Sequence, residues 1–145
     1  FNFFARLHGV DGATADARRE VLFQRFGIDR FAEVKVANLS TGMKQKTSLA
    51  VSLVHDPDII IFDEPTNGLD VLTARVVTDF LAELRGQDKT IILSTHIFSL
   101  VERLCDRVGI IVDGRLTHCD TLAALCGDLS LEDRFFEIYK ALKDQ

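Results

Sequence analysis

The chain has 145 residues, of which 47% are hydrophobic and 27% charged, a composition typical of a folded domain with a sizeable core and not of a disordered or repetitive chain. Its 17 basic residues against 22 acidic ones give a net charge of −5, the wrong sign for a domain that binds nucleic-acid phosphates, so we expect no nucleic-acid partner. The longest apolar run, near residues 59–62, is strand-sized and far shorter than the roughly 18 to 20 residues of a membrane span.

The three cysteines form an odd set without a CxxC pair. Cys105, Cys119 and Cys126 therefore argue against a disulfide framework or a zinc site. We expect reduced thiols in a cytosolic compartment.

Helical spacing dominates the first third of the chain. A short helix is expected around residues 3–7, and a second helix, with Thr14 as its cap, ends at Gly27. A third helix follows the segment 39–42, where Ser or Thr can cap it, and runs toward Asp56-Pro57. No strand is expected before Asp58.

The hydrophobic period changes at Asp58. The β-branched run Ile59–Phe62 is typical of a parallel strand that is covered on both faces. Asp70 then opens a helix, and Thr90–Ser94 forms a second buried strand. The order strand, helix, strand predicts a right-handed crossover and a parallel sheet.

The last third predicts a helix, a hairpin and further helices. A helix is expected over Phe98–Leu104, followed by a strand over Val108–Val112. The dipeptide Asp113-Gly114 between apolar runs indicates a hairpin turn into a strand over Arg115–His118. The remaining residues have helical periodicity.

Ionisable residues follow both predicted parallel strands: Asp63 and Glu64 after the first, His96 after the second. In open α/β sheets, ligands bind beyond the carboxyl ends of the strands. Adjacent carboxylates at such a place repel each other and lose hydration, which favours a cation or a proton-handling role, although a solvated turn is the alternative. Consecutive strand residues point to opposite faces, so Asp63 could hold a hydrated Mg²⁺ while Glu64 faces the reacting centre.

Three separated motifs occur in the order found in one family. They are Leu39-Ser40-Thr41-Gly42-Met43, the string Ile-Ile-Ile-Phe-Asp-Glu-Pro-Thr-Asn-Gly-Leu-Asp at 59–70, and Ser94-Thr95-His96. Together they resemble the ATP-binding cassette (ABC) ATPases. The resemblance implies an α/β, P-loop NTPase-like fold with mostly parallel strands and a helical subdomain.

The segment 39–43 resembles the ABC signature motif, which binds the ATP held by a second subunit. Ser40, Thr41, Gly42 and Met43 are its candidate ATP-binding residues. A hydroxyl, a glycine and unpaired amides at a helix N-terminus form an anion site that suits a γ-phosphate, whereas an ordinary helix cap is the alternative. Thr41 and Met43 depart from the common pattern, which has Gly and Gln there. The string from Ser40 to Lys46 resembles the exporter subgroup for sodium, drugs or lipids.

The resemblance also assigns roles at the strand ends. Asp63 resembles the Walker B carboxylate that organises Mg²⁺, and Glu64 the base that orients the attacking water. Gly68, Leu69 and Asp70 resemble the D-loop, which crosses the interface between two subunits, although Asp70 can cap the next helix at the same time. His96 resembles the switch histidine that contacts the γ-phosphate.

No GxxxxGK[ST] segment, the P-loop that cradles phosphates, occurs in the sequence. Together with the abrupt start at Phe1, this predicts the C-terminal part of a cassette whose Walker A part is missing. We therefore expect the isolated chain to be inactive as an ATPase. We expect a helical (signature) subdomain at 1–56, the C-terminal part of the ATPase core at 57–119 and C-terminal helices at 120–145.

The expected function is that of the ATPase subunit of an ABC exporter, with ATP and Mg²⁺ as cofactors. Its expected partners are an integral membrane subunit and a second ATPase subunit, in a homodimer, and its expected location is the inner face of the cell membrane as a peripheral cytoplasmic protein. Two alternatives stay open: an ABC ATPase that acts on ribosomes or DNA, and an ABC-like module that pairs with a partner without hydrolysing ATP.

Overall fold

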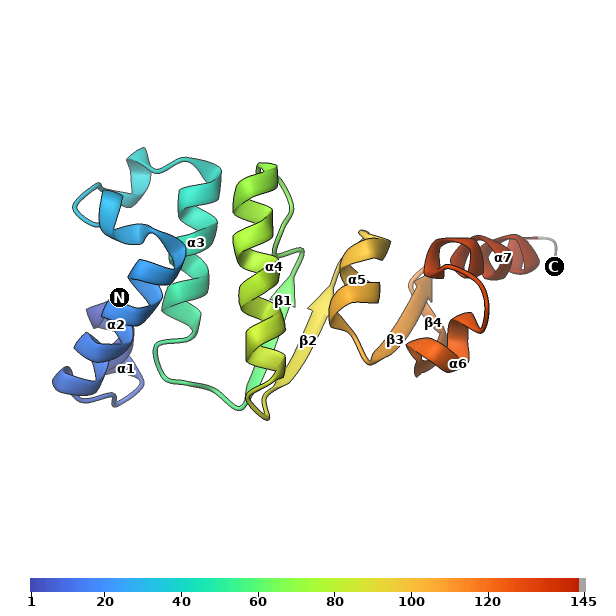
Figure 1. The fold of residues 1–145 in the computed structure, drawn as a ribbon, viewed down its shortest axis with the longest axis horizontal. Coiled ribbons are helices and arrows are strands. Elements are labelled where there is room, and N and C mark those ends of the chain that lie inside the picture. The colour runs from blue at the N-terminus through green and yellow to red at the C-terminus, as the bar shows by residue number, and fades with distance from the viewer. Residues whose placement is uncertain (144–145) are drawn as a thin grey trace. The chain divides into compact units, whose positions relative to one another are not determined.

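The computed structural model describes residues 1–143, which form two compact units that divide after Ser94. The first unit begins with helices and ends with a two-stranded sheet (Figure 1). In chain order its elements are α1 (Asn2–Leu7), α2 (Gly12–Phe26), η1 (Ile28–Phe31), η2 (Val36–Asn38), α3 (Thr41–Ser52), β1 (Ile59–Asp63), α4 (Val71–Arg85) and β2 (Thr90–Ser94).

Helix α2 is closed at both ends by its flanking residues. Asp11 is the N-cap, because its carboxylate accepts a hydrogen bond from the backbone N–H of Thr14 at 3.0 Å. The prediction that Thr14 caps this helix is therefore wrong: an acidic side chain three residues earlier reaches the free N–H of Thr14 first. Gly27 ends the helix as predicted, with a left-handed φ of 63° that glycine adopts without steric cost.

Helix α3 confirms the prediction that a Ser or Thr starts it. Ser40 is the N-cap, and its hydroxyl accepts a hydrogen bond from the backbone N–H of Met43 at 3.3 Å. Further along, Leu49 and Ala50 are buried, as are Leu53 and Val54 just after the helix. The predicted signature segment is thus held at the exposed end of a helix whose other end lies in the core.

Strands β1 and β2 form the predicted parallel pair, in register from Ile59 opposite Thr90 to Asp63 opposite Ser94. Helix α4 connects them and buries its apolar stripe, including Val77 and Leu81. The prediction that β1 is covered on both faces is wrong for this chain, and so is the prediction that β2 is buried, since Ile92 of β2 is 54% exposed. Alternate residues Ile60 and Phe62 are buried, whereas Ile59 and Ile61 are 62% and 72% exposed, because the described residues cover one face of the strand only.

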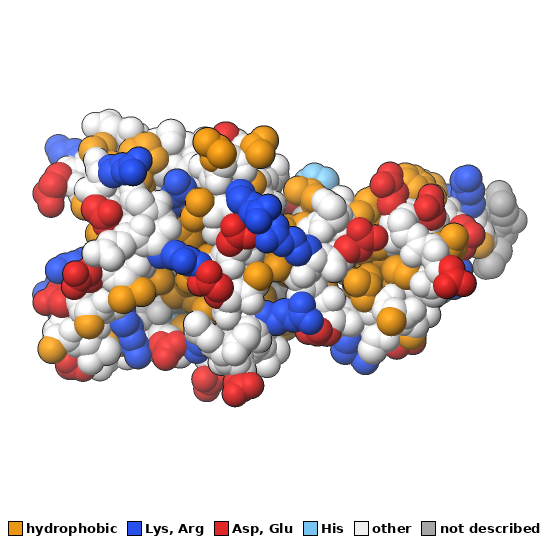
Figure 2. All heavy atoms as spheres, in the orientation of Figure 1, with side chains coloured by type: hydrophobic (Ala, Val, Ile, Leu, Met, Phe, Trp, Pro, Cys, Tyr) orange, Lys and Arg blue, Asp and Glu red, His pale blue; other side chains and the backbone are white. Residues whose placement is uncertain are grey.

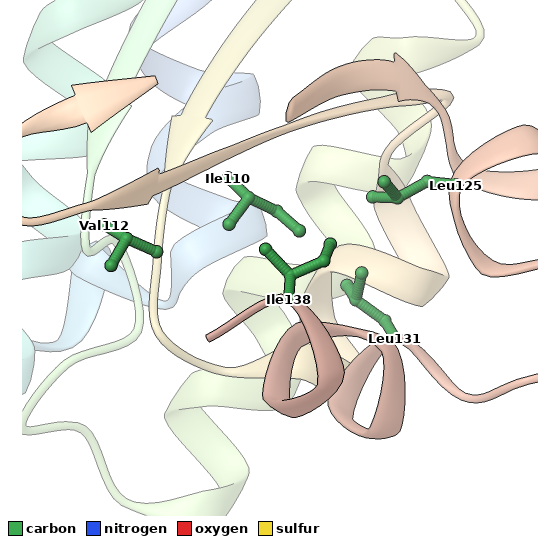
Figure 3. Close-up of a cluster of buried hydrophobic side chains, with 5 residues drawn as sticks. All are labelled: Ile110, Val112, Leu125, Leu131 and Ile138. Atoms are coloured by element: carbon green, nitrogen blue, oxygen red, sulfur yellow. The ribbon is translucent and has the colours of Figure 1, made fainter. Parts of the chain in front are cut away.

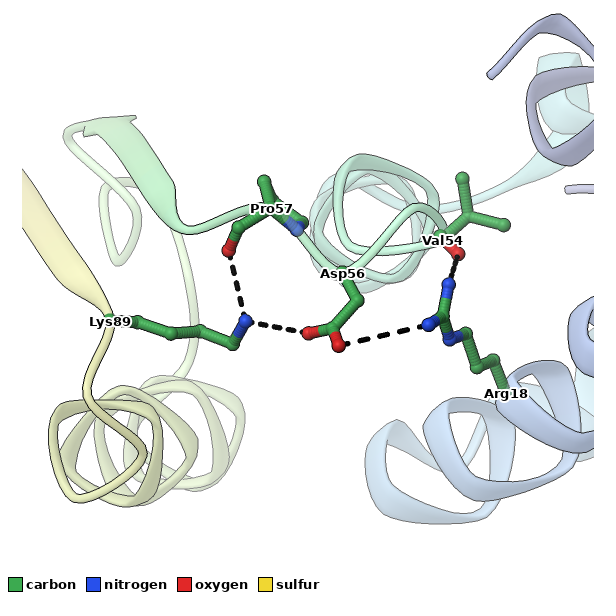
Figure 4. A network of polar contacts seen from close by, with 5 residues as sticks. All are labelled: Arg18, Val54, Asp56, Pro57 and Lys89. Atoms are coloured by element: carbon green, nitrogen blue, oxygen red, sulfur yellow. Dashed lines mark hydrogen bonds and ion pairs between the residues drawn. The ribbon is translucent and has the colours of Figure 1, made fainter. Parts of the chain in front are cut away.

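A polar network ties the helical part of the first unit to its sheet (Figure 4). Lys89, just before β2, donates to the carboxylate of Asp56 at 2.6 Å and to the carbonyl of Pro57 at 3.0 Å. Arg18 of α2 donates to the carbonyl of Val54 at 2.9 Å and lies 3.7 Å from the same carboxylate. The Lys89 hydrogen bond is the main cause that lowers the pKa of Asp56, against a smaller opposing effect of burial.

The second unit has its own core. Its elements are α5 (Phe98–Leu104), β3 (Arg107–Val112), β4 (Arg115–Thr121), α6 (Leu122–Cys126) and α7 (Leu131–Lys143). Strands β3 and β4 form the predicted antiparallel hairpin, turning at Asp113 and Gly114. Figure 3 shows the buried cluster between the hairpin and the last two helices, formed by Ile110, Val112, Leu125, Leu131 and Ile138.

The surface mixes charges of both signs. On the face shown in Figure 2, Lys and Arg side chains lie among Asp and Glu side chains, with apolar side chains between them. Within residues 1–143, no helix combines the length and the apolar character that crossing a membrane requires.

We expect the change Lys89→Met to lower the free energy of unfolding by about 1 to 2 kcal/mol at neutral pH, because it removes the donor of the Pro57 carbonyl and the nearer of the two cations beside Asp56. The folded-state pKa of Asp56 lies below its ordinary value, so the part of this stabilisation that comes from Asp56 is present above about pH 4 and is lost as the pH falls through the folded pKa. Urea unfolding at several pH values checks both points. Lys44→Met, at an exposed lysine of α3, is the matched control; an equal loss in both variants contradicts the prediction.

Candidate functional site

Asp63, the last residue of β1, stands at the carboxyl end of the parallel sheet. Its carboxylate is exposed and accepts a hydrogen bond from the hydroxyl of Ser94, its neighbour in the register of β2. Because side chains of paired residues in neighbouring strands lie on the same face, the pairing of the strands brings these two oxygen groups together. The result is a carboxylate and a hydroxyl side by side, open to solvent, where ligands of parallel sheets bind.

Glu64 follows in a strained backbone conformation. Its φ is +45°, a left-handed value that few residues other than glycine adopt. The backbone holds it on both sides: its N–H donates to the carbonyl of Ser94 at 3.0 Å, and its carbonyl accepts from the N–H of Asn67 at 3.0 Å. Backbone strain of this kind persists where surrounding hydrogen bonds impose it, and it clusters at functional sites.

The turn at Glu64 gives the side chains of Asp63 and Glu64 different degrees of burial. Asp63 is exposed, whereas Glu64 is half-buried and is followed by the buried residues Pro65 and Thr66. The two carboxyl groups that the sequence singled out therefore have different environments, as different roles require.

The predicted signature residues lie against the predicted D-loop of the same unit. A Cβ atom on Gly42 would lie 3.7 Å from the Thr73 side chain and 3.8 Å from that of Leu69. A Cβ atom on Gly68, in turn, would lie 3.8 Å from the Thr41 side chain. The start of α3 and the loop before α4 thus pack together, and the glycines at these positions let the two segments approach each other closely.

Asp70 is the N-cap of α4. Its carboxylate accepts hydrogen bonds from the backbone N–H of Thr73 at 3.0 Å and from the Thr73 hydroxyl at 2.8 Å. These bonds, the backbone one foremost, lower the pKa of Asp70 and keep it charged next to the positive end of the helix. The capping role that the sequence suggested for Asp70 is confirmed, while its D-loop role stays a prediction.

His96 lies in the second unit, in the loop between β2 and α5. The side chain is exposed, and the hydroxyl of the preceding Thr95 accepts a hydrogen bond from the N–H of Ile97 at 3.2 Å. This bond fixes the short loop that carries the histidine. That His96 works together with Glu64 stays a prediction.

Within residues 1–143, no cluster of three or more His, Cys, Asp or Glu side chains could hold a metal ion by itself. The donors at the end of β1 nevertheless suit Mg²⁺, since both Asp63 and Ser94 offer oxygen atoms. Mg²⁺ is commonly bound by one or two carboxylates, with water and substrate phosphates completing its shell. Asp63 and Ser94 fit this pattern, in which the protein supplies only some of the Mg²⁺ ligands.

Two residues of this region escaped the sequence analysis in the roles that the structure gives them. Ser94 was noted only as part of a motif, yet its hydroxyl binds Asp63. Gln45 of α3 appeared only as part of the string from Ser40 to Lys46, yet its side-chain amide donates to the carbonyl of Pro65 at 3.1 Å. The strand register could have suggested the first contact, whereas no sequence signal indicates the second.

Comparison with known proteins places these features in a family. A family profile described as ABC transporter matches residues 2–67. The chain is 40% identical over 131 residues to the ABC transporter ATP-binding protein NatA of Bacillus subtilis, covering 90% of this chain and 53% of that protein. It is 39% identical over 112 residues to Nod factor export ATP-binding protein I of Burkholderia lata, covering 77% of this chain and 37% of that protein.

Solved structures agree. A structure titled as the ATP binding subunit of an ABC transporter superimposes with a TM-score of 0.88 at 29% identity, over 95% of this chain and 60% of that one. The chain belongs to the ABC transporter ATPase family. A dimeric ATP-binding cassette in a post-hydrolysis state, bound to ADP and Pi, matches with a TM-score of 0.68 at 27% identity, over 77% of this chain and 49% of that one.

The fold class predicted from the sequence is confirmed by these superpositions, as is the ABC family itself. The ABC chain spans about half the length of the curated relatives it matches, 53% of NatA and 37% of the Nod factor export protein.

Gly68, in the predicted D-loop, offers a test of the packing described above. We expect Gly68→Ala to lower the free energy of unfolding by about 1 kcal/mol, because Gly68 has a φ of +69° that strains an L-residue. Gly12→Ala is the matched control, since Gly12 has no left-handed φ and its Cβ would meet no atom within 4 Å. Chemical denaturation of both variants checks this; a destabilised Gly12→Ala together with a neutral Gly68→Ala contradicts it.

Proposed function

We propose that this chain is the ATP-hydrolysing component of an ABC exporter, with Glu64 and His96 as its catalytic residues. The observation that carries the proposal is the end of β1, where an exposed carboxylate precedes a strained, half-buried Glu64. The N-terminus of α3, which suits an anion, packs against the loop that connects β1 to α4. The match to ATP-binding relatives supports the same assignment.

Glu64 is assigned the task of holding the attacking water. Phosphoryl transfer asks little covalent chemistry of a protein, so most of the rate comes from placing water, metal and charge. Backbone hydrogen bonds on both sides of Glu64 fix the point from which its side chain extends, which reduces the freedom that the residue loses when its carboxylate binds that water. His96 is assigned to the γ-phosphate, to which a ring N–H can donate.

Asp63, with the hydroxyl of Ser94, is assigned to Mg²⁺, in part through water. When bound, Mg²⁺ neutralises the charge that develops on the phosphate oxygens. The chain's own contribution is to keep the carboxylate at the edge of the sheet, in the orientation that Ser94 fixes.

The signature residues are assigned to ATP held by a second subunit. Ser40 already binds the N–H of Met43, so the N–H groups of Thr41 and Gly42 are the ones that the first turn of α3 can offer to phosphate. Because Gly42 has no side chain, it leaves the path of a phosphate to these N–H groups open. Leu69 and its D-loop neighbours then belong to the contact between two ATPase subunits, in keeping with the dimeric relative bound to ADP and Pi.

An integral membrane subunit is the proposed partner, which would place this chain on the cytoplasmic face of the cell membrane. Relatives are named as export ATP-binding proteins for fluoroquinolones and for Nod factor. The apolar side of α1 is the proposed contact surface, since Phe3 and Leu7 are 64% and 65% exposed.

The change Glu64→Gln tests the catalytic proposal in the expressed protein that contains this chain. We expect ATP hydrolysis to fall by about 100-fold or more, because an amide cannot accept the proton of the attacking water. Binding of a fluorescent ATP analogue should stay within about threefold, because the side chain keeps its size. Glu20→Gln, an exposed carboxylate of α2, is the control. Undiminished hydrolysis in Glu64→Gln would sink the assignment of the base.

The partner surface has a separate test. We expect Phe3→Glu and Leu7→Glu to reduce the fraction of protein that sediments with membranes by about tenfold, since a buried charge costs several kcal/mol at an apolar contact. Leu116→Glu, a residue of β4 with a similar exposure of 63%, is the control. Equal recovery of all three variants with membranes would count against α1 as the contact.

A further inference from the structure

Gln45 joins the signature helix to the turn that carries Glu64. Its side-chain Nε2 donates a hydrogen bond to the backbone carbonyl of Pro65 at 3.1 Å, between residues 20 positions apart in the chain. The bond is partly buried, and Pro65 itself is among the most deeply buried side chains. Gln45 thus reaches the residue directly after the proposed base.

The carbonyl of Pro65 needs such a partner. Proline has no backbone N–H, so the carbonyl is the only polar backbone group that Pro65 can contribute. A buried carbonyl without a hydrogen bond costs free energy comparable to a lost hydrogen bond. Within a turn already strained at Glu64, an unpaired carbonyl would favour rearrangement of the local backbone.

The hydrogen bonds around Glu64 form a set in which each fixes a different group. Ser94 accepts the N–H of Glu64, and Asn67 donates to the carbonyl of Glu64. Gln45 fixes the next carbonyl along the chain. The first two bonds come from β2 and from the turn itself, so Gln45 supplies the tie from the helical part of the unit.

We propose that Gln45 is a positioning residue: its hydrogen bond to the Pro65 carbonyl holds the left-handed turn at Glu64 and so aims the Glu64 carboxylate. The proposal rests on the proposed function of Glu64 and extends it to a residue that acts on Glu64 through the Pro65 carbonyl. Loss of the bond frees the turn, and the carboxylate then spends less time in its working position, which lowers kcat and leaves the KM for ATP unchanged.

Two changes at Gln45 separate the hydrogen bond from side-chain size. Gln45→Glu keeps the size but replaces the donor with an acceptor that faces the Pro65 carbonyl, so kcat should fall about tenfold with the KM for ATP within about twofold. Gln45→Lys keeps a donor of similar reach, so kcat should stay within about threefold. Ser48→Ala, at an exposed position one turn further along α3, is the control. A kcat for Gln45→Glu within twofold of the parent, or an equal loss in Gln45→Lys, would overturn the proposal.

A second measurement needs no catalysis and keeps the two proposals distinguishable. Hydrogen exchange at Asn67 and Leu69, whose N–H groups donate to the carbonyls of Glu64 and Thr66, should speed up about tenfold in Gln45→Glu and stay unchanged in Ser48→Ala. Gln45→Met replaces Gln45→Glu if the charged variant does not fold. Unchanged exchange at both amides overturns the role of Gln45, whereas hydrolysis that survives Glu64→Gln overturns only the assignment of the base.

Discussion

The left-handed backbone of Glu64 is the constraint on which the candidate site depends. A residue with a side chain pays of the order of 1 to 2 kcal/mol for this conformation, and neighbouring bonds must hold it there. Pairing of β1 with β2 supplies the carbonyl of Ser94, and the turn supplies the N–H of Asn67. The sheet therefore does more than expose two carboxylates: it also fixes the direction in which the chain leaves the strand.

Helix α3 of the first unit has two roles in the proposed mechanism. Its N-terminus, at Ser40 and Gly42, is the proposed contact to a second subunit's ATP. One turn further, Gln45 reaches the turn of the chain's own proposed base. A separate network at Asp56 ties the far end of the same helical region to the start of β2, so the helices and the sheet of this unit are joined at both ends of α3.

Parallel strands are usually covered on both faces, whereas the described part of this chain leaves one face of β1 exposed at Ile59 and Ile61. The same chain spans 60% of the solved ABC subunit on which it superimposes with a TM-score of 0.88. The part of the fold that this chain contains thus has the geometry of the family, while its sheet has apolar surface available for further contacts.

The sequence by itself determined the features that depend on near neighbours. Ser40 and Asp70 as helix caps, the parallel strands and the hairpin at Asp113 follow from residue type and short spacing, and the structure confirms them. Even there, Asp11 and not Thr14 caps α2, because the helix begins at Gly12 and Thr14 already lies in its first turn. The order of the three motifs was also enough to predict the family.

Only the tertiary structure decided which distant groups meet. The contacts of Gln45 with Pro65 and of Ser94 with Asp63 join residues 20 and 31 positions apart. Such contacts depend on strand register and on how one helix packs against a loop, which local propensity does not encode. For the same reason, the continuous β-branched run predicted a β1 covered on both faces, while the exposure of Ile61 is set by what the rest of the chain packs against it.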